Sequence, residues 1–512
     1  MLFRPAGLVT LFLLLSFSSL ITRGAADDKD ASFYNQAGSD KYAQGDLNGA
    51  ISDYNHAIAL NPQMAKAYYN RGLAKYDNND LTGAIADYNQ AIKINPDYED
   101  AYVNRGLARD DNNDLDGAIA DDNAALKLDP KDPYAYNNRG WAKYRKGDSD
   151  GAIADYNIAI GLSPSLSQPY NDRGVAERDK GRTAEAIADY THAIQLDPND
   201  DQAYYNRAVA RNDKDDADGA ISDFGEAIKI DPKYADAYAG RAETEAGQGD
   251  WDGAIADYNS AAGLDGKNAA LYNERGLAWY HKGDPDHALA DYDTAIQLDP
   301  RNNYAFNNRG NLEKDQGHLA DALADYDQAL TIDNKFSNTY NNRGVVEEMR
   351  GDLAGAWADY NQAVASDPKN AEAYNNLSSI CNARKDWNGA IKNANHALGL
   401  VSGFAQAYNN RGVAEYHQHN FDAALADFDQ AIQVDPNDEH AYNNRGLAEQ
   451  ARGDFEAAIG DFNFAMQINP QFLQAQHNRG LAEWRRGLAE CCSGNFISAG
   501  DFISAIQDLY LY

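Results

Sequence analysis

Residues 65–98 read AKAYYNRGLAKYDNNDLTGAIADYNQAIKINPDY, and nearly the same string returns whenever the sequence is shifted by 34 residues. Counted from Ala31, glycine recurs at position 8 of this period, alanine at positions 20 and 27, and proline at position 32. Such a period is the signature of a repeat array or solenoid. Thirteen repeats occupy residues 31–472 without insertion, and a fourteenth loses the pattern after Arg486. The repeats begin at residues 31, 65, 99, 133, 167, 201, 235, 269, 303, 337, 371, 405, 439 and 473.

The pattern within a repeat predicts two helices. Tyr, Gly and Ala at positions 4, 8 and 10 give the first helix an apolar face at helical spacing. A polar turn such as residues 77–80 (DNND) follows, and its side chains can cap the next helix. The second helix carries Ala, Ile, Tyr, Ala, Ile and Leu at positions 20, 21, 24, 27, 28 and 30. Proline at position 32 ends it, because proline has no N–H to continue the helix.

With this period and these Gly, Ala and Pro positions, the chain resembles the tetratricopeptide repeat family over nearly all of its length after residue 30. The resemblance implies an all-α fold, a right-handed α-solenoid superhelix of about fourteen helix-turn-helix repeats over residues 31–487. It also implies that the first helices line a concave groove and that the second helices lie outside. The family is defined by architecture, so the resemblance alone says little about the partner.

The first thirty residues predict an export signal. Arg4 precedes an apolar stretch, residues 8–21 (LVTLFLLLSFSSLI), and Gly24, Ala25 and Ala26 precede the charged residues 27–30. We expect residues 1–26 to be a signal peptide cleaved near Ala26, with a short segment at 27–30 and a periplasmic or secreted product. A single N-terminal anchor helix is the alternative interpretation.

At the other end, residues 488–512 (LAECCSGNFISAGDFISAIQDLYLY) lose the period and gain apolar residues. Solenoids need a terminal cap, so a degenerate repeat that caps the array is the simpler interpretation. A docking tail is the alternative. The cysteines Cys381, Cys491 and Cys492 do not form a disulfide framework.

Composition excludes several classes of function. The 512 residues include 79 Asp and Glu against 45 Lys and Arg, a formal charge of −34, which disfavours nucleic acid and anionic membrane surfaces. With 43% hydrophobic and 11% aromatic residues the chain can still build a core. The ten histidines are scattered, and no nucleophile elbow, phosphate-binding loop or HExxH motif occurs. The acidic turn at residues 111–117 lacks the spacing of a calcium loop. We therefore expect no catalytic residue, no metal and no cofactor.

Arginine at position 7 replaces the leucine usual in the family, and aspartate fills position 23. In the eleventh repeat both change together, to Leu377 and Asn393. We hypothesise an ion pair that joins two helices. The first repeat, with Ala37 and Asp53, favours a pair between neighbouring repeats, whereas the eleventh favours a pair within one repeat.

Asparagine recurs at two adjacent positions of the first helix, on the side turned away from the core. An amide donates and accepts hydrogen bonds, so a row of amides can hold a peptide backbone whatever its side chains. The row is similar to the asparagine ladder of the repeat domain in O-linked N-acetylglucosamine transferase. The alternative is that these amides only bridge neighbouring helices. The predicted partner-binding residues at position 6 are Asn70, Asn104, Asn138, Asn206, Asn308, Asn342, Asn376, Asn410, Asn444 and Asn478, and those at position 5 are Asn137, Asn307, Asn341, Asn409 and Asn443.

Three further positions bear on the groove. Position 9 is apolar in ten repeats, as at Leu73 and Val345, and lies either in the groove or between adjacent first helices. Position 12 offers aromatic anchors such as Tyr76. Position 13 is often aspartate, as at Asp77 and Asp111, which favours neutral or basic partners.

These observations favour a non-catalytic scaffold that binds a neutral or basic protein or peptide in its groove, with no nucleic acid and no stable membrane insertion. The alternative is a structural component of a cell-envelope or export machine that docks through its convex face or its C-terminal tail.

Overall fold

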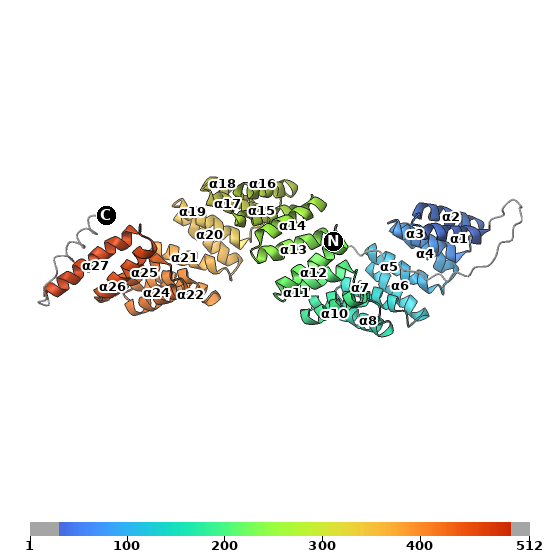
Figure 1. Cartoon of the computed structure of the whole chain (residues 1–512), viewed down its shortest axis with the longest axis horizontal. Helices are drawn as coiled ribbons and strands as arrows, with labels where there is room; N and C mark the ends of the chain where they lie inside the picture. The colour runs from blue at the N-terminus through green and yellow to red at the C-terminus, as the bar shows by residue number, and fades with distance from the viewer. Residues whose placement is uncertain (1–29, 493–512) are drawn as a thin grey trace. The chain divides into compact units, whose positions relative to one another are not determined.

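The computed structural model describes residues 30–492, with only the backbone of 490–492. The predicted signal peptide and most of the segment 488–512 lie outside the described residues. Within 30–492 every regular element is one of 27 α-helices, arranged in successive pairs (Figure 1), so the fold is the predicted all-α solenoid. Over the same residues, every helix is too short or too polar to cross a bilayer.

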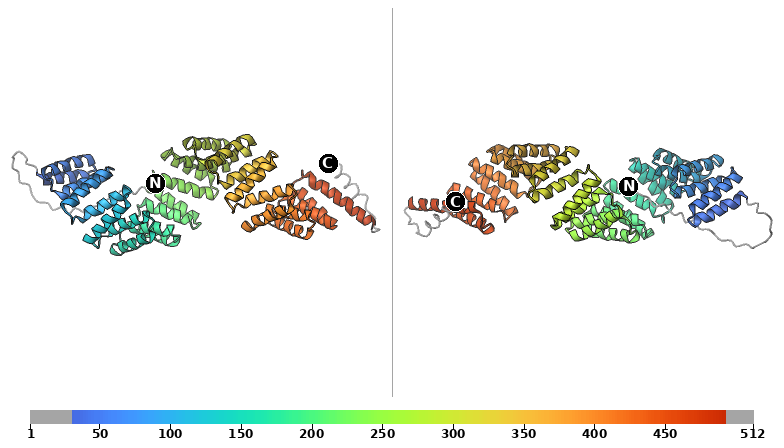
Figure 2. Two further views of the ribbon diagram at one scale, coloured as in Figure 1. Left: turned by 180° about the vertical axis from the view of Figure 1, so that it is seen from behind. Right: turned by 90° about the horizontal axis from the view of Figure 1, so that it is seen from above.

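The chain forms two compact bodies, one ending at Leu264 and the other beginning at Asp265. Within each body an odd-numbered helix packs on the even-numbered helix that follows it, and that helix packs on the next odd one (Figure 2). The first helix of each repeat therefore has an odd number, and the second helix has an even number.

The first body contains the helices of repeats 1 to 7. Its first helices are α1 (Ala31–Ala43), α3 (Ala65–Asp77), α5 (Glu99–Asp111), α7 (Pro133–Arg145), α9 (Gln168–Asp179), α11 (Asp201–Asn212) and α13 (Ala235–Gly247). Its second helices are α2 (Leu47–Leu60), α4 (Leu81–Ile94), α6 (Leu115–Leu128), α8 (Ser149–Leu162), α10 (Thr183–Leu196), α12 (Ala217–Ile230) and α14 (Trp251–Leu264).

The second body contains the remaining repeats. Its first helices are α15 (Ala269–Lys282), α17 (Asn303–Asp315), α19 (Ser337–Met349), α21 (Ala371–Ala383), α23 (Ala405–His417), α25 (Glu439–Arg452) and α27 (Leu473–Cys492). Its second helices are α16 (Pro285–Leu298), α18 (Leu319–Ile332), α20 (Leu353–Ser366), α22 (Trp387–Leu400), α24 (Phe421–Val434) and α26 (Phe455–Ile468).

Local sequence accounts for the helix ends. The aspartate at position 16 caps most second helices, as where Asp352 accepts a hydrogen bond from the Gly355 N–H. Position 15 has positive φ in all thirteen complete repeats, a conformation that glycine adopts without strain. Glycine fills it in eight repeats; the other five have Asn79, Asn113, Asp215, Lys385 and His419.

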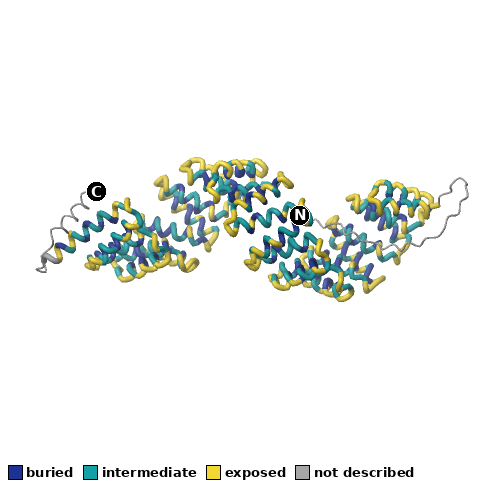
Figure 3. Tube along the Cα trace, in the orientation of Figure 1, coloured by how far each residue is buried: buried dark blue, intermediate teal, exposed yellow. Residues whose placement is uncertain are grey.

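The core of most repeats is built from small side chains and one ring; the third repeat has Asp122 and the eleventh Ala394 in place of the ring. The alanines at positions 20 and 27 are buried, and Figure 3 shows buried segments in dark blue along the helices. Where position 24 is aromatic and position 8 is glycine, the ring packs against that glycine. A Cβ added at Gly344 would lie 2.7 Å from the Tyr360 ring. Position 8 therefore stays small because it sets how closely the two helices of a repeat approach.

The arginine at position 7 and the aspartate at position 23 pair within one repeat. Arg343 donates from Nε and Nη2 to the two carboxylate oxygens of Asp359, both at 2.7 Å. The same two-bond pairing occurs in every described repeat that has both residues, and Asp359 is only 6% exposed. The structure thus decides the question that the first and eleventh repeats left open. In the first repeat, which lacks the arginine, Lys41 binds Asp53 at 2.7 Å instead.

The same guanidinium also reaches the preceding repeat. Nη1 of Arg343 donates to Asp327, at position 25 of the previous second helix, at 2.6 Å. The ring of Tyr340 lies under its carbon, with 5.6 Å between Cζ and the ring centroid. One side chain therefore holds three elements: its own first helix, its own second helix and the second helix before it.

Replacing Arg343 with Leu should strip a buried carboxylate of its cation and cost about 3–5 kcal/mol. The double variant Arg343→Leu, Asp359→Asn reproduces the natural combination Leu377 and Asn393, so it should recover at least half of that loss. Urea unfolding followed by far-UV circular dichroism measures both effects.

The control is Arg452→Leu, which breaks an ion pair between the exposed side chains of Arg452 (51% exposed) and Asp422 (91% exposed). It should lower the free energy of unfolding by less than about 1 kcal/mol. Equal losses in the single and double variants would contradict the pairing.

Position 11 sets the charge beside this ion pair. In repeats 2, 3, 4 and 6 a cation lies there, as where Lys75 binds Asp87 at 2.8 Å. Several later repeats have glutamate instead, and one carboxyl oxygen of Glu347 and of Glu449 is buried with no hydrogen-bond partner. Burial, together with the nearby Asp359, raises the pKa of Glu347 to about 7 despite Arg343, and Asp352 acts in the same direction. Burial and Asp461 likewise raise the pKa of Glu449 to about 8, with Arg445 opposing and Asp454 adding to the rise.

Because an unfolded glutamate has a pKa near 4.5, the folded chain holds protons that the unfolded chain releases between pH 4.5 and about 8. The free energy of unfolding should therefore fall as the pH rises through this window. The variant Glu347→Gln, Glu449→Gln should flatten that fall, measured as thermal midpoints between pH 5 and 9. A matched change at the exposed Glu372 should leave the profile of the parent, and an unchanged slope in the double variant would contradict this account.

Candidate functional site

The first helices form the side of each body on which neighbouring repeats lie closest. Among the described residues, most successive odd-numbered helices of a body, such as α3 and α5, contact one another, whereas successive even-numbered helices make no comparable contact. Closer spacing of the first helices is what a concave inner side requires. We call the exposed surface of the odd-numbered helices the inner face.

A row of amide hydrogen bonds crosses this inner face in the second body. Each asparagine at position 6 donates from Nδ2 to Oδ1 of the asparagine at position 5 in the preceding repeat, over 2.8–3.1 Å. We call this row the asparagine ladder. Its donor and acceptor pairs are Asn308 and Asn273, Asn342 and Asn307, Asn376 and Asn341, Asn410 and Asn375, Asn444 and Asn409, and Asn478 and Asn443.

The ladder is interrupted in the first body. Asn70 and Asn206 bind the position-5 asparagines Asn35 and Asn171 in the same way. Asn104, however, donates to the hydroxyl of Tyr69, which replaces asparagine there. Asn138 has no asparagine partner, because the preceding repeat has Val103 at position 5. Asn137 donates to Asp172, which replaces asparagine at position 6. Repeat 7 has Ala239 and Gly240 at the two ladder positions.

The two ladder positions differ in exposure. Of the five predicted binding residues at position 5, Asn137, Asn307, Asn341 and Asn443 are buried, at 1–7% exposure, and Asn409 is half-buried. The four buried amides are therefore inaccessible to a partner, and they act as hydrogen-bond partners within the ladder. The position-6 amides are half-buried except Asn478, which is 8% exposed.

A buried position-5 amide also holds the core. Oδ1 of Asn307 accepts from Asn342 and, at 2.9 Å, from the hydroxyl of Thr339, which is fully buried. In some repeats the position-5 amide also donates to the position-6 amide beside it, as from Asn307 to Oδ1 of Asn308 at 3.3 Å. The position-6 amide then has two hydrogen bonds, one within its repeat and one to the preceding repeat. It still keeps one N–H and one oxygen lone pair, because an amide has two of each.

The apolar stripe at position 9 mostly packs inward. Leu73 packs against a cluster of Ala84, Tyr88 and Ala108, and Val345 against one that includes Tyr360 and Leu377. Both clusters combine a second helix with the first helix of the next repeat, so position 9 packs at the boundary between repeats. This supports packing between repeats over exposure in the groove.

Positions 12 and 13 are linked by a hydrogen bond across several boundaries, which sequence reasoning missed. The hydroxyl of Tyr76 donates to Oδ2 of Asp111, 35 residues further on, and Tyr42, Tyr144 and Tyr280 do the same with Asp77, Asp179 and Asp315. The signal was present, since four of the five tyrosines at position 12 are followed by aspartate at position 13 of the next repeat; Tyr416 is the exception. These tyrosines thus serve as donors to the inner face as well as aromatic surface.

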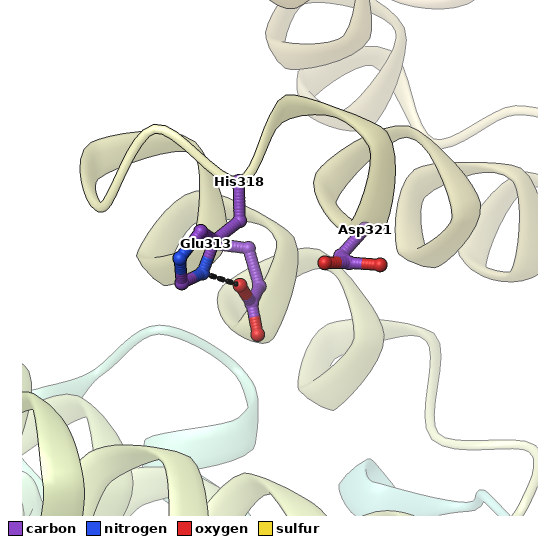
Figure 4. Close-up of side chains that lie close together, drawn as sticks. All are labelled: Glu313, His318 and Asp321. Atoms are coloured by element: carbon purple, nitrogen blue, oxygen red, sulfur yellow. Dashed lines mark hydrogen bonds and ion pairs between the residues drawn. The ribbon is translucent and has the colours of Figure 1, made fainter.

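One further cluster has the residue types of a metal site. Glu313 at the end of α17, His318 in the turn and Asp321 in α18 have donor atoms within 4.8 Å of one another (Figure 4), and no other such group occurs among the described residues. His318 Nδ1 lies 2.7 Å from Glu313 Oε2. The fifth repeat has Glu177 and Arg182 at the positions of Glu313 and His318, joined by an ion pair. His318 therefore occupies the position that Arg182 has in the fifth repeat, and its contact with Glu313 joins the first helix to the turn in the same way.

Comparison with protein families identifies the period. Models described as tetratricopeptide repeat match residues 269–302 and 405–438, residues 103–167, 307–371 and 350–403, and residues 201–234. A model described as TPR repeat matches residues 38–79, 72–109 and 174–215. Together they cover more than half of the chain. A comparison with curated proteins found no match.

Several solved structures are similar to the chain. The APC/C hetero-tetramer Cut9–Hcn1 matches 88% of this chain and 96% of its own, with 13% identity and a TM-score of 0.48. MamA matches 33% of this chain and 92% of its own, at 28% identity and a TM-score of 0.31. A tetratricopeptide repeat protein from Parabacteroides merdae matches 48% of this chain and 98% of its own, at 20% identity and a TM-score of 0.38.

The two ladder positions should respond differently to truncation. Asn307→Ala leaves the buried Thr339 hydroxyl without its acceptor and should lower the free energy of unfolding by about 1–3 kcal/mol. Asn342→Ala removes a half-exposed amide whose partners water can reach, and it should cost less than about 1 kcal/mol. Chemical denaturation of the two single variants measures the difference, and equal costs would contradict a division into support and surface.

Proposed function

Because the chain belongs to the tetratricopeptide repeat family, we propose that it is a non-catalytic scaffold that binds an extended polypeptide along its inner face. Proteins built from these repeats are generally interaction scaffolds without catalytic activity. We further propose that the partner lies against the position-6 asparagines, mainly in the second body, where the ladder is continuous.

The observation that carries the proposal is the state of the position-6 amides. Each uses one N–H toward the preceding repeat, which fixes its plane, and is half-exposed in nearly every case. The remaining N–H and lone pair match the C=O and N–H of a peptide backbone. An amide that is already held loses little side-chain entropy when a partner binds, so the ladder is preorganised.

The spacing of the ladder suits an extended chain. Packed helices lie about 8–10 Å apart, and an extended chain advances about 3.3 Å per residue. One repeat therefore corresponds to about three residues of the partner. Individual backbone contacts are weak, but a partner that spans several repeats sums them at high effective concentration.

The proposed place of action is outside the cytoplasm. Support comes from the sequence alone: a basic residue, an apolar stretch at residues 8–21 and small residues before the charged segment 27–30. Export brings the scaffold to partners in the periplasm or the medium.

The test uses a fluorescent, uncharged 21-residue peptide of composition (Gln-Ser-Gln)7, read by anisotropy. The variant Asn342→Ala, Asn410→Ala, Asn444→Ala should bind it at least tenfold more weakly, because three backbone contacts of about 0.5–1.5 kcal/mol each are lost. The matched control, Gln328→Ala, Gln362→Ala, Gln430→Ala, removes three exposed amides from second helices and should bind like the parent.

Two outcomes would contradict the proposal. If the peptide fails to bind the parent chain, the inner face is not a general polypeptide site. If the asparagine and glutamine variants lose affinity equally, the contact lies elsewhere, on the second helices or after Leu488, as the assembly-component alternative requires.

A further inference from the structure

The boundaries between repeats place an aromatic ring beside a carboxylate on the inner face. In the first body this occurs three times, where Tyr42, Tyr76 and Tyr144 donate to aspartates of the next repeat. The tyrosines are half-buried, whereas Asp77, Asp111 and Asp179 are exposed. Each pair therefore presents a partly exposed tyrosine and a solvent-accessible carboxylate that its hydrogen bond holds in place.

The tyrosine contributes no charge to the pair. Burial, followed by the hydrogen bond to the aspartate, raises the pKa of Tyr42 and of Tyr144 well above its ordinary value. For Tyr280 the bond to Asp315 is the largest cause, and its pKa rises to about 12. The phenol thus remains a donor at neutral pH and leaves the carboxylate's charge uncompensated.

The chain itself shows that a guanidinium fits at this position. At the boundary of repeats 5 and 6, Arg178 replaces the tyrosine, and its Nε lies 2.6 Å from Oδ2 of Asp213. At the boundary of repeats 3 and 4 the order is reversed, and Arg145 binds the carboxylate of Asp110 at 2.9 Å. Wherever an arginine is available at these positions in the first body, it occupies the carboxylate.

The three boundaries of the first body with a tyrosine–aspartate pair have the acid and no such cation. Among the described residues, Asp77, Asp111 and Asp179 form no ion pair with a basic side chain, whereas in the second body Asp315 lies 3.3 Å from Lys314. The chain as a whole carries 34 more negative than positive charges, so cations of a partner are drawn to it over longer range as well.

We propose that the pairs Tyr42–Asp77, Tyr76–Asp111 and Tyr144–Asp179 are subsites for lysine or arginine side chains of the bound polypeptide. This inference rests on the proposed function, since it concerns the same inner face, and it specifies a basic partner. The carboxylate binds the cation, and the tyrosine ring contacts the aliphatic stem or the charge. The first two pairs lie on consecutive boundaries, so basic side chains about three residues apart satisfy both.

The experiment compares three 21-residue peptides, (Lys-Ser-Gln)7, (Gln-Ser-Gln)7 and (Glu-Ser-Gln)7, on the full mature chain. The lysine peptide should bind the parent most tightly and lose affinity as salt is raised. The variant Asp77→Asn, Asp111→Asn, Asp179→Asn should bind it about tenfold more weakly, because three charge pairs are lost. Its affinity for the glutamine peptide should not change.

The control keeps the net charge equal. Asp116→Asn, Asp150→Asn, Asp218→Asn removes three exposed carboxylates from second helices of the same body. It should bind the lysine peptide like the parent. All six aspartates are exposed, so the variants should stay folded, which circular dichroism verifies.

The outcomes separate the two proposals. If the lysine peptide loses affinity equally in both aspartate variants, or binds the parent no better than the glutamine peptide, the subsites are wrong while the proposed function stands. If none of the three peptides binds the parent, the proposed function itself fails.

Discussion

The arginine at position 7 is the interaction on which the remaining structure depends. Its guanidinium binds two oxygens of a buried carboxylate, a side chain of the preceding second helix and an aromatic face, so one residue fixes three elements. A buried ion pair adds little stability over a well-packed apolar pair, but it strongly penalises arrangements that separate its partners. In the eleventh repeat, where the ion pair is absent, Leu377 and Ile380 pack instead in an apolar cluster with Tyr360 of the tenth repeat. The arginine therefore specifies geometry more than it adds free energy.

That geometry is what builds the inner face. Position 7 follows the two ladder positions directly, so the arginine that locks a first helix also sets where its asparagines meet those of the preceding repeat. The same placement brings position 12 of one repeat to position 13 of the next. The ladder and the tyrosine–aspartate pairs are thus two results of one repeated orientation. They divide the inner face, with the continuous ladder in the second body and most of the aromatic–acid pairs in the first.

Much of this was predictable because the period is strict. The helices, their caps and the small residues at positions 8, 20 and 27 follow from spacing and from backbone chemistry, and the structure confirms them. The sequence left the direction of the Arg–Asp pair open, since the first and eleventh repeats gave opposite hints. It also treated Asn307 and Asn342 alike, although the first is buried and the second half-exposed. Periodicity shows which residues recur but not the rotation between neighbouring repeats, and that rotation decides which residues 35 apart in sequence touch. The bond between Tyr76 and Asp111 was missed for this reason.

The spacing of these contacts has a consequence for how such a chain changes length in evolution. The bonds that join repeats connect residues 16 or 35 apart, and they are nearly the same at one boundary as at the next. Loss or duplication of one whole repeat by recombination within its gene keeps the 16- and 35-residue spacing, so the bonds common to most boundaries can form again. An insertion of another length within a helix changes the spacing on which these bonds depend. The length of a repeat is therefore more tightly constrained by these contacts than the number of repeats.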